Sequence, residues 1–151
     1  MKREEISKFL DPTKAFSEGV AFIEEFDPLT GAVCRINATR AARPKQQLGK
    51  TVETPVAKCS FCQPYIDTST PKFPKDFCLD GRIKHGGAIL FPNLFPLTDL
   101  HGVCVFTPQH KLDLNLFDAG EISDGLFASI EFLKAGREAG APHHLLGWNQ
   151  G

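Results

Sequence analysis

The sequence predicts a single α+β domain in which a sheet packs against one long helix. The chain has 151 residues, a length that suits one domain of ordinary size. Apolar residues make up 42% of the chain and charged residues 23%, as in globular proteins that fold around a core. Several short segments have strand-type patterning, and one long segment has helical periodicity.

Residues 1–26 predict a helical leader. Apolar residues recur at helical spacing in two runs, Ile6/Phe9/Leu10 and Phe16/Val20/Ile23. The pair Asp11-Pro12 separates the two runs, because proline cannot continue a helix. We therefore expect two short helices that pack on the rest of the chain.

Residues 27–31 (DPLTG) predict a turn, because proline presets φ and Gly31 is free to adopt a positive φ. Residues 32–36 then predict a short strand. From about 46 to 86 the chain is rich in turn-forming and polar residues and has little periodicity. This segment is long for a loop. We expect this segment to be functional or to be held by a ligand such as a metal ion.

The C-terminal half predicts two strands and the long helix. Residues 87–91 form an apolar run and residues 101–107 alternate, with the proline-flanked segment 92–96 between them. Asp118 and Glu121 have the spacing of a capping box. Apolar residues then recur at helical spacing at Ile122, Leu126, Ile130 and Leu133. We expect a helix over about 119–139 and a last short strand over 145–148.

The charge balance gives no general electrostatic reason to expect nucleic acid or an anionic membrane as a partner. The chain has 17 Lys and Arg against 18 Asp and Glu, which gives a net charge of −1. Its N-terminus lacks the apolar core of a signal peptide, and it contains no apolar run of membrane-spanning length. Five cysteines form an odd set that favours a reducing compartment. We therefore expect a cytoplasmic protein.

Cys59 and Cys62 form a Cys-x-x-Cys pair, which can place two thiolates on one ion. The remaining ligands have six candidates: Cys78, His85, His101, His110, His143 and His144. A redox disulfide is an alternative, although such motifs normally begin a helix after a strand. A pair without a special role is the third interpretation, and Cys34, Cys78 and Cys104 are expected to be small buried hydrophobic residues.

Phosphate and base recognition has its own candidates. Arg40 and Arg43 can give forked contacts to a diphosphate, with a solvated basic loop as the alternative. Asn93 and Phe95 can offer an amide and a ring to a nucleotide, with turn chemistry and a core phenylalanine as the alternative. His101, in the middle of a predicted strand, fits a buried histidine with satisfied hydrogen bonds.

Taken in order, these motifs resemble those of the galactose-1-phosphate uridylyltransferases. The family's opening signature, DPLTG followed by RAxRP, is similar to residues 27–31 and 40–44. The later family motifs follow in the same order: Cys-x-x-Cys at 59–62, NxFP at 93–96, TPxH at 107–110, a long helix and NxG at 149–151. The resemblance covers about residues 26–151. It extends to nucleotide-sugar and dinucleoside-polyphosphate phosphorylases of the histidine-triad superfamily, whose HEV motif is similar to residues 101–103.

The resemblance implies a histidine-triad-like antiparallel sheet with a long packing helix over residues 27–151. It implies a zinc site at Cys59, Cys62 and His110, in which zinc orders the site rather than activating water. It also assigns nucleotide or phosphate contacts to six residues: Arg40, Arg43, Phe61, Asn93, Phe95 and Asn149. The expected ligand is a nucleotide-sugar or a dinucleotide.

The chemistry implied by the resemblance is ping-pong transfer of a nucleotidyl group through a covalent nucleotidyl-histidine. In the family, the nucleophile belongs to an HPH motif that follows the NxG strand end. The chain has no His-x-His and stops at Gly151, and His143 and His144 precede that position and fit a loop pair. We therefore assign no catalytic residue and expect the nucleophilic histidine beyond Gly151.

As the N-terminal half of a two-repeat transferase, the chain alone is expected to be inactive, and its partners are a second copy or a complementing C-terminal half. A zinc-stabilised nucleotide-binding or partner-binding module without catalysis is the first alternative function. A structural or redox Cys-x-x-Cys protein is the second. The nucleotide base and the sugar stay open.

Overall fold

The computed structural model describes residues 3–7, 9–17, 19, 21–26, 29–43, 55–110 and 113–148. The strands are β1 (Arg3–Ile6), β2 (Ala21–Phe26), β3 (Val33–Ile36), β4 (Ile83–His85), β5 (Ala88–Pro92) and β6 (Gly102–Val105). The α-helices are α1 (Ile66–Ser69) and α2 (Ala119–Glu138). Short 3₁₀ turns are η1 (Pro12–Lys14), η2 (Ala38–Ala42), η3 (Val56–Lys58) and η4 (Leu114–Leu116). These elements confirm the α+β prediction.

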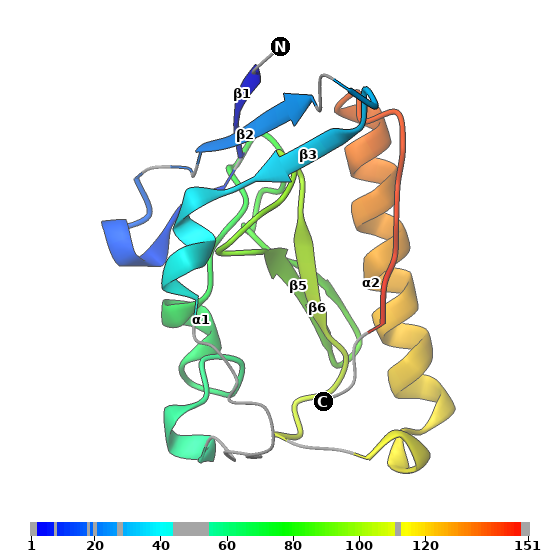
Figure 1. Cartoon of the computed structure of the whole chain (residues 1–151). Helices are drawn as coiled ribbons and strands as arrows, with labels where there is room; N and C mark the ends of the chain where they lie inside the picture. The colour runs from blue at the N-terminus through cyan, green and yellow to red at the C-terminus, as the bar shows by residue number, and fades with distance from the viewer. Residues whose placement is uncertain are drawn as a thin grey trace.

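The strands form two antiparallel sheets of three strands each, ordered β1-β2-β3 and β4-β5-β6. In the second sheet Leu90 of β5 lies opposite Ile83 of β4 and Cys104 of β6. Helix α2 runs along this sheet and contacts all three of its strands, whereas the first sheet lies at one end of the molecule (Figure 1). The predicted strands at 32–36, 87–91 and 101–107 are confirmed as β3, β5 and β6.

Helix α2 begins where the capping box predicts. The Asp118 carboxylate accepts a hydrogen bond from the Glu121 amide at 2.8 Å, and Glu121 returns one to the Asp118 amide. The residues buried on its sheet-facing side are small: Gly125, Ala128, Ser129 and Gly136. Small residues let the helix approach the sheet closely, and the Phe106 ring lies directly over Gly125.

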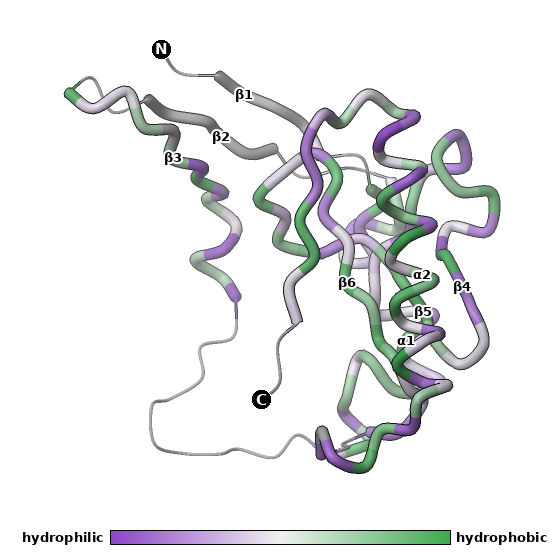
Figure 2. Tube along the Cα trace, turned by 90° about the vertical axis from the view of Figure 1, so that its right-hand side faces the viewer, coloured by the Kyte–Doolittle hydropathy of each residue, from purple (hydrophilic) through white to green (hydrophobic). Residues whose placement is uncertain are grey.

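The core lies between α2 and the second sheet. Buried Phe73, Ala88, Leu90 and Ala128 form its centre, and hydrophobic residues gather on β5, β6 and the facing helix (Figure 2). The Phe73 ring lies 4.9 Å from Phe77 and 5.5 Å from Phe132, measured between ring centroids. Phenylalanine therefore supplies much of the apolar volume that holds the sheet to the helix.

The prediction of a helical leader at 1–26 is wrong. Residues 3–6 and 21–26 are strands that pair with each other, and β2 also pairs with β3. Over runs this short, helical and strand periodicities are hard to distinguish, and pairing with a distant strand overrides local preference. Asp11 does start a turn of helix, but it is the three-residue η1, with Pro12 at its first position.

The prediction of a last strand over 145–148 is also wrong. Residues 141–148 have no regular secondary structure, and the Leu145 side chain is 92% exposed. Trp148 is held by its ring instead, with edge-on contacts to Phe106 at 4.7 Å and Phe117 at 6.0 Å. Aromatic packing therefore takes the place of strand pairing in this segment.

The N-terminal segment is attached to the loop that follows β5. Buried Asn37 donates from Nδ2 to the Pro96 carbonyl at 2.7 Å, and Ser7 donates from Oγ to the Asp99 carbonyl at 3.1 Å. These contacts place η2, which carries Arg40, beside that loop. None of the helices in the described part of the chain is long and apolar enough to cross a membrane.

Candidate metal centre

The Cys-x-x-Cys pair lies on a tight turn between η3 and α1. The Cys59 amide donates to the Val56 carbonyl at 3.2 Å, and the Cys62 amide donates to the Cys59 carbonyl at 3.2 Å. The Ile66 amide then donates to the Cys62 carbonyl at 2.9 Å. Backbone hydrogen bonds on both sides of the turn therefore orient the two thiols.

His110 reaches the same place from the segment that follows β6. Buried Thr107 donates from Oγ1 to the Glu121 carboxylate at 2.6 Å and accepts at Oγ1 from the Gln109 amide. Because Glu121 belongs to the capping box of α2, the start of the long helix anchors the segment that carries His110.

The three predicted zinc ligands lie together. The Cys62 Sγ is 3.1 Å from His110 Nδ1, and the ligand atoms of Cys59, Cys62 and His110 all lie within 4.8 Å of one another. In a tetrahedral zinc site, sulfur and nitrogen ligands are about 3.5–3.8 Å apart, given bonds of about 2.3 and 2.0–2.1 Å. The group can therefore hold a metal ion, and its donor set is compatible with zinc. Within the described residues no fourth cysteine, histidine or carboxylate joins it.

The site combines a buried thiol with an exposed imidazole. Cys62 is buried, Cys59 is half-buried and His110 is exposed. Burial, together with the neighbouring Cys59 thiol, raises the pKa of Cys62. A cation opposes this effect because the thiolate is the metal-binding form, so metal binding here releases protons.

The other histidines and cysteines considered from the sequence lie in different surroundings. His85 Nδ1 is 3.5 Å from the Glu131 carboxylate, and the His85 ring stacks on Phe127. Cys78 packs against the core, and Cys104 is half-buried with its Sγ 3.7 Å from the Gly125 carbonyl. His143 and His144 are exposed on the irregular segment after α2. The prediction that Cys34 is buried is wrong, because its side chain is exposed.

Three of the predicted nucleotide residues lie together. Arg40 donates from Nη1 to the Phe95 carbonyl at 2.7 Å, and the Phe95 amide donates to Asn93 Oδ1 at 2.8 Å. The same loop contacts His101, whose Nδ1 accepts from the Leu97 amide at 3.1 Å. Arg40 and Asn93 therefore shape the loop that follows β5.

The other predicted nucleotide residues lie elsewhere. Arg43 is exposed at the end of η2. Phe61 lies between the two cysteines, half-exposed, with its ring 5.8 Å from Phe91 of β5. Asn149 lies outside the described residues. The structure thus groups Arg40, Asn93 and Phe95, whereas Phe61 lies in the turn at 59–62 that carries the two cysteines.

His101 is a half-buried histidine held by hydrogen bonds, as expected from its place in the sequence. Burial, and secondly the Arg40 charge, lower its pKa. Its Nδ1 accepts from the Leu97 amide, and its Nε2 lies 3.3 Å from Asn93 Nδ2, so both ring nitrogens have polar neighbours in the loop after β5.

A cavity of about 320 Å³ lies beside Phe95. It is lined by Asp11, Thr13, Lys14, Thr39, Ala42, Leu94 and Phe95. Ligand pockets typically begin at about 300 Å³, so the cavity is large enough for part of a small ligand.

Arg82, which bonds to the α1 segment that follows Cys62, is a residue that sequence reasoning missed. It is buried, with 6% of its surface exposed, immediately before β4. No motif or spacing pointed to it, because a lone arginine beside a glycine has no pattern of its own.

Comparisons with known proteins found no protein family, curated protein or solved structure that matches this chain.

Proposed function

We propose that the chain is a zinc-stabilised domain that binds a nucleotide-sugar or dinucleotide, of the type found in nucleotidyltransferases. The observation that carries the proposal is the convergence of Cys59, Cys62 and His110, whose ligand atoms lie within 4.8 Å of one another. Two thiolates and an imidazole are borderline-soft donors, the set that zinc prefers in structural sites.

The role of zinc in this proposal is structural. The turn at 59–62 and the segment after β6 come from distant parts of the chain, and a shared ion holds them together. Zinc bound by two thiolates and an imidazole supplies cross-linking rather than redox chemistry.

The nucleotide part of the proposal rests on the resemblance of the motif order to galactose-1-phosphate uridylyltransferases. The loop after β5 supports it, because Arg40 and Phe95 are in direct contact beside a cavity of about 320 Å³. In this proposal Phe95 and Asn93 contact the nucleoside, and Arg43, with an exposed side chain, contacts the phosphates.

Nucleotidyl transfer through a histidine is proposed only for this chain together with the part that carries the nucleophile. No residue of this chain is assigned the nucleophilic role. No His-x-His occurs in the 151 residues, so the nucleophile is assigned to a longer parent chain or to another polypeptide. The alternative without catalysis, a binding module, shares the zinc site and the nucleotide contacts and differs only in turnover.

Two measurements test the proposal. Elemental analysis of the purified chain should find one zinc per chain, lost in Cys59→Ser and kept in Cys34→Ser, whose cysteine is exposed and lies outside the cluster. Calorimetry with UDP-, ADP- and GDP-sugars should find binding of at least one donor. A zinc-free chain with a reversible Cys59–Cys62 disulfide would instead support the redox function.

A further inference from the structure

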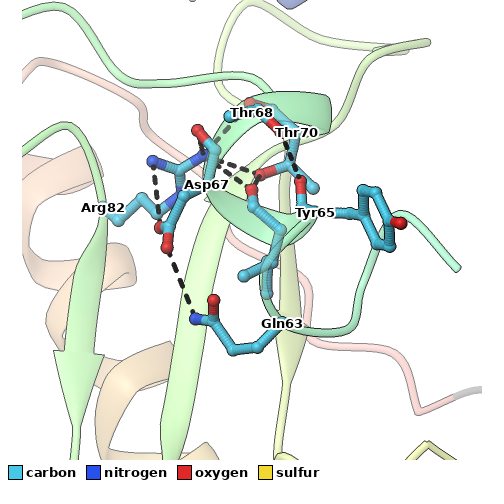
Figure 3. A network of polar contacts seen from close by, with 7 residues as sticks. Gln63, Tyr65, Asp67, Thr68, Thr70 and Arg82 are labelled. Atoms are coloured by element: carbon cyan, nitrogen blue, oxygen red, sulfur yellow. Dashed lines mark hydrogen bonds and ion pairs between the residues drawn. The ribbon is translucent and has the colours of Figure 1, made fainter. Parts of the chain in front are cut away.

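The buried guanidinium of Arg82 holds the carbonyl end of α1. Its Nη2 donates to the carbonyls of Ile66 at 2.9 Å and Thr70 at 3.1 Å and to the Thr70 hydroxyl at 2.8 Å (Figure 3). A longer contact joins Nη2 to the Asp67 carbonyl at 3.3 Å. One nitrogen of Arg82 therefore faces four oxygens of a single short segment.

Burying a guanidinium is costly unless its hydrogen bonds are satisfied. The Asp67 carboxylate, 3.9 Å from Nη1 and half-exposed, gives the nearest opposite charge, while Arg82 Nε has no partner among the described residues. Burial lowers the pKa of Arg82, and Asp67 partly opposes this effect. The main partners of the buried Arg82 guanidinium are therefore the carbonyls of the α1 segment rather than the Asp67 carboxylate.

Ile66 connects the hydrogen bonds of Arg82 to the cysteine turn at 59–62. Its amide donates to the Cys62 carbonyl at 2.9 Å, and its carbonyl accepts from Arg82 and from the Thr70 hydroxyl. Ile66 itself is 2% exposed. One buried residue thus bonds to the Cys62 backbone on one side and to the guanidinium on the other.

Arg82 lies immediately before the sheet whose last strand leads to His110. It immediately precedes β4, β4 pairs with β5, and β5 pairs with β6, after which the chain reaches His110. The cysteine turn and the histidine segment are otherwise separate in the sequence. Arg82 therefore links the α1 segment, which follows the cysteine turn, to the start of the sheet whose last strand precedes the His110 segment.

We propose that Arg82 is a positioning residue for the metal centre: by fixing the α1 carbonyls, it sets the place of the Cys62 thiolate relative to His110. The proposal rests on the zinc site proposed above. Groups that hydrogen-bond to metal ligands typically change metal affinity about ten- to a hundredfold when they are replaced, and Arg82 acts on Cys62 through the hydrogen bonds of Ile66.

The test uses Co²⁺ as the metal, because its visible spectrum reports ligand type and tetrahedral geometry. Arg82→Met should bind Co²⁺ about ten- to a hundredfold more weakly than the original chain and show shifted ligand-field bands. Arg82→Lys, which keeps the charge but not the planar fork, should lie between the two. Lys84→Met is the matched control, because it removes an exposed positive charge two residues away and should change neither property.

A second variant covers the case in which Arg82→Met does not fold. Thr70→Val removes one of the four acceptors while the guanidinium stays in place, and it should shift the same bands. Unchanged Co²⁺ affinity and spectrum in the folded Arg82 variants, or in Thr70→Val if they do not fold, would overturn the positioning role. Absence of a sulfur-to-cobalt charge-transfer band in the original chain would instead refute the metal site itself.

Discussion

The Sγ of Cys62 lies 3.1 Å from Nδ1 of His110, although 48 residues separate them in the sequence. Two elements produce this contact: the backbone-bonded turn at 59–62, and the segment after β6 that Thr107 ties to Glu121 of α2. Loss of either element should therefore affect metal binding, and loss of the metal should destabilise both.

Replacement of Cys59 by serine should remove zinc and destabilise the fold. Structural zinc in small zinc-finger peptides contributes about 10–16 kcal/mol of apparent binding free energy at neutral pH, and part of it should appear here as a lower melting temperature. Elemental analysis and thermal unfolding check this, with Cys34→Ser as the control. Equal zinc content and equal melting in Cys59→Ser would refute the ligand assignment.

Replacement of Arg43 by alanine should weaken nucleotide-sugar binding without affecting folding. Its side chain is exposed, so the loss concerns a phosphate contact rather than packing. A charge-assisted hydrogen bond is worth about 1.5–3 kcal/mol, so the Kd should rise roughly tenfold or more. Calorimetry is the measurement, and Arg137→Ala on the exposed side of α2 is the control. Equal affinity in Arg43→Ala and the original chain would contradict the phosphate role.

Replacement of Gly125 by alanine should destabilise the protein, although alanine is the better helix former. A Cβ at this position would lie 2.4 Å from the Phe106 ring, and such overpacking typically costs about 1–3 kcal/mol. Gly136→Ala in the same helix is the control, because its Cβ would meet nothing closer than 3.7 Å, so it should be neutral or stabilising by up to about 1 kcal/mol. Chemical denaturation measures both. If Gly125→Ala did not lower the free energy of unfolding relative to Gly136→Ala, the close packing of α2 on Phe106 would be contradicted.

The His101 ring should titrate below its ordinary value of 6.5, because burial and Arg40 lower its pKa. A histidine whose pKa is lower in the folded state binds fewer protons there than in the unfolded chain. Its contribution to stability is therefore complete above pH 6.5 and is lost as the pH falls toward the folded-state pKa. NMR titration of the ring checks this directly. A His101 pKa at or above 6.5 would contradict the burial of the ring and its proximity to Arg40.

The metal site was accessible to sequence reasoning, whereas its support was not. The cysteine pair and the TPxH segment are local patterns whose order matches a known family, so three ligands could be predicted before any geometry was available. The Arg82 network has no local pattern, because its partners are backbone carbonyls of a segment 12 to 16 residues earlier.

The helices and strands also differed in how well they could be predicted from the sequence. Helix α2 was predictable because its capping box and its long periodicity are both contained in one segment. β1 and β2 were mistaken for helices because their patterns are short and their structure depends on pairing with each other. The segment 141–148 was mistaken for a strand because apolar side chains alone do not show whether a neighbouring strand is present to pair with.

X-ray absorption at the zinc edge of the zinc-loaded chain identifies the ligands of the ion. We expect one zinc per chain with two sulfur ligands at about 2.3 Å and at least one imidazole nitrogen at about 2.0–2.1 Å, and loss of the zinc in Cys62→Ser. A zinc ion with only oxygen and nitrogen neighbours, or a chain that takes up no zinc, would contradict this expectation.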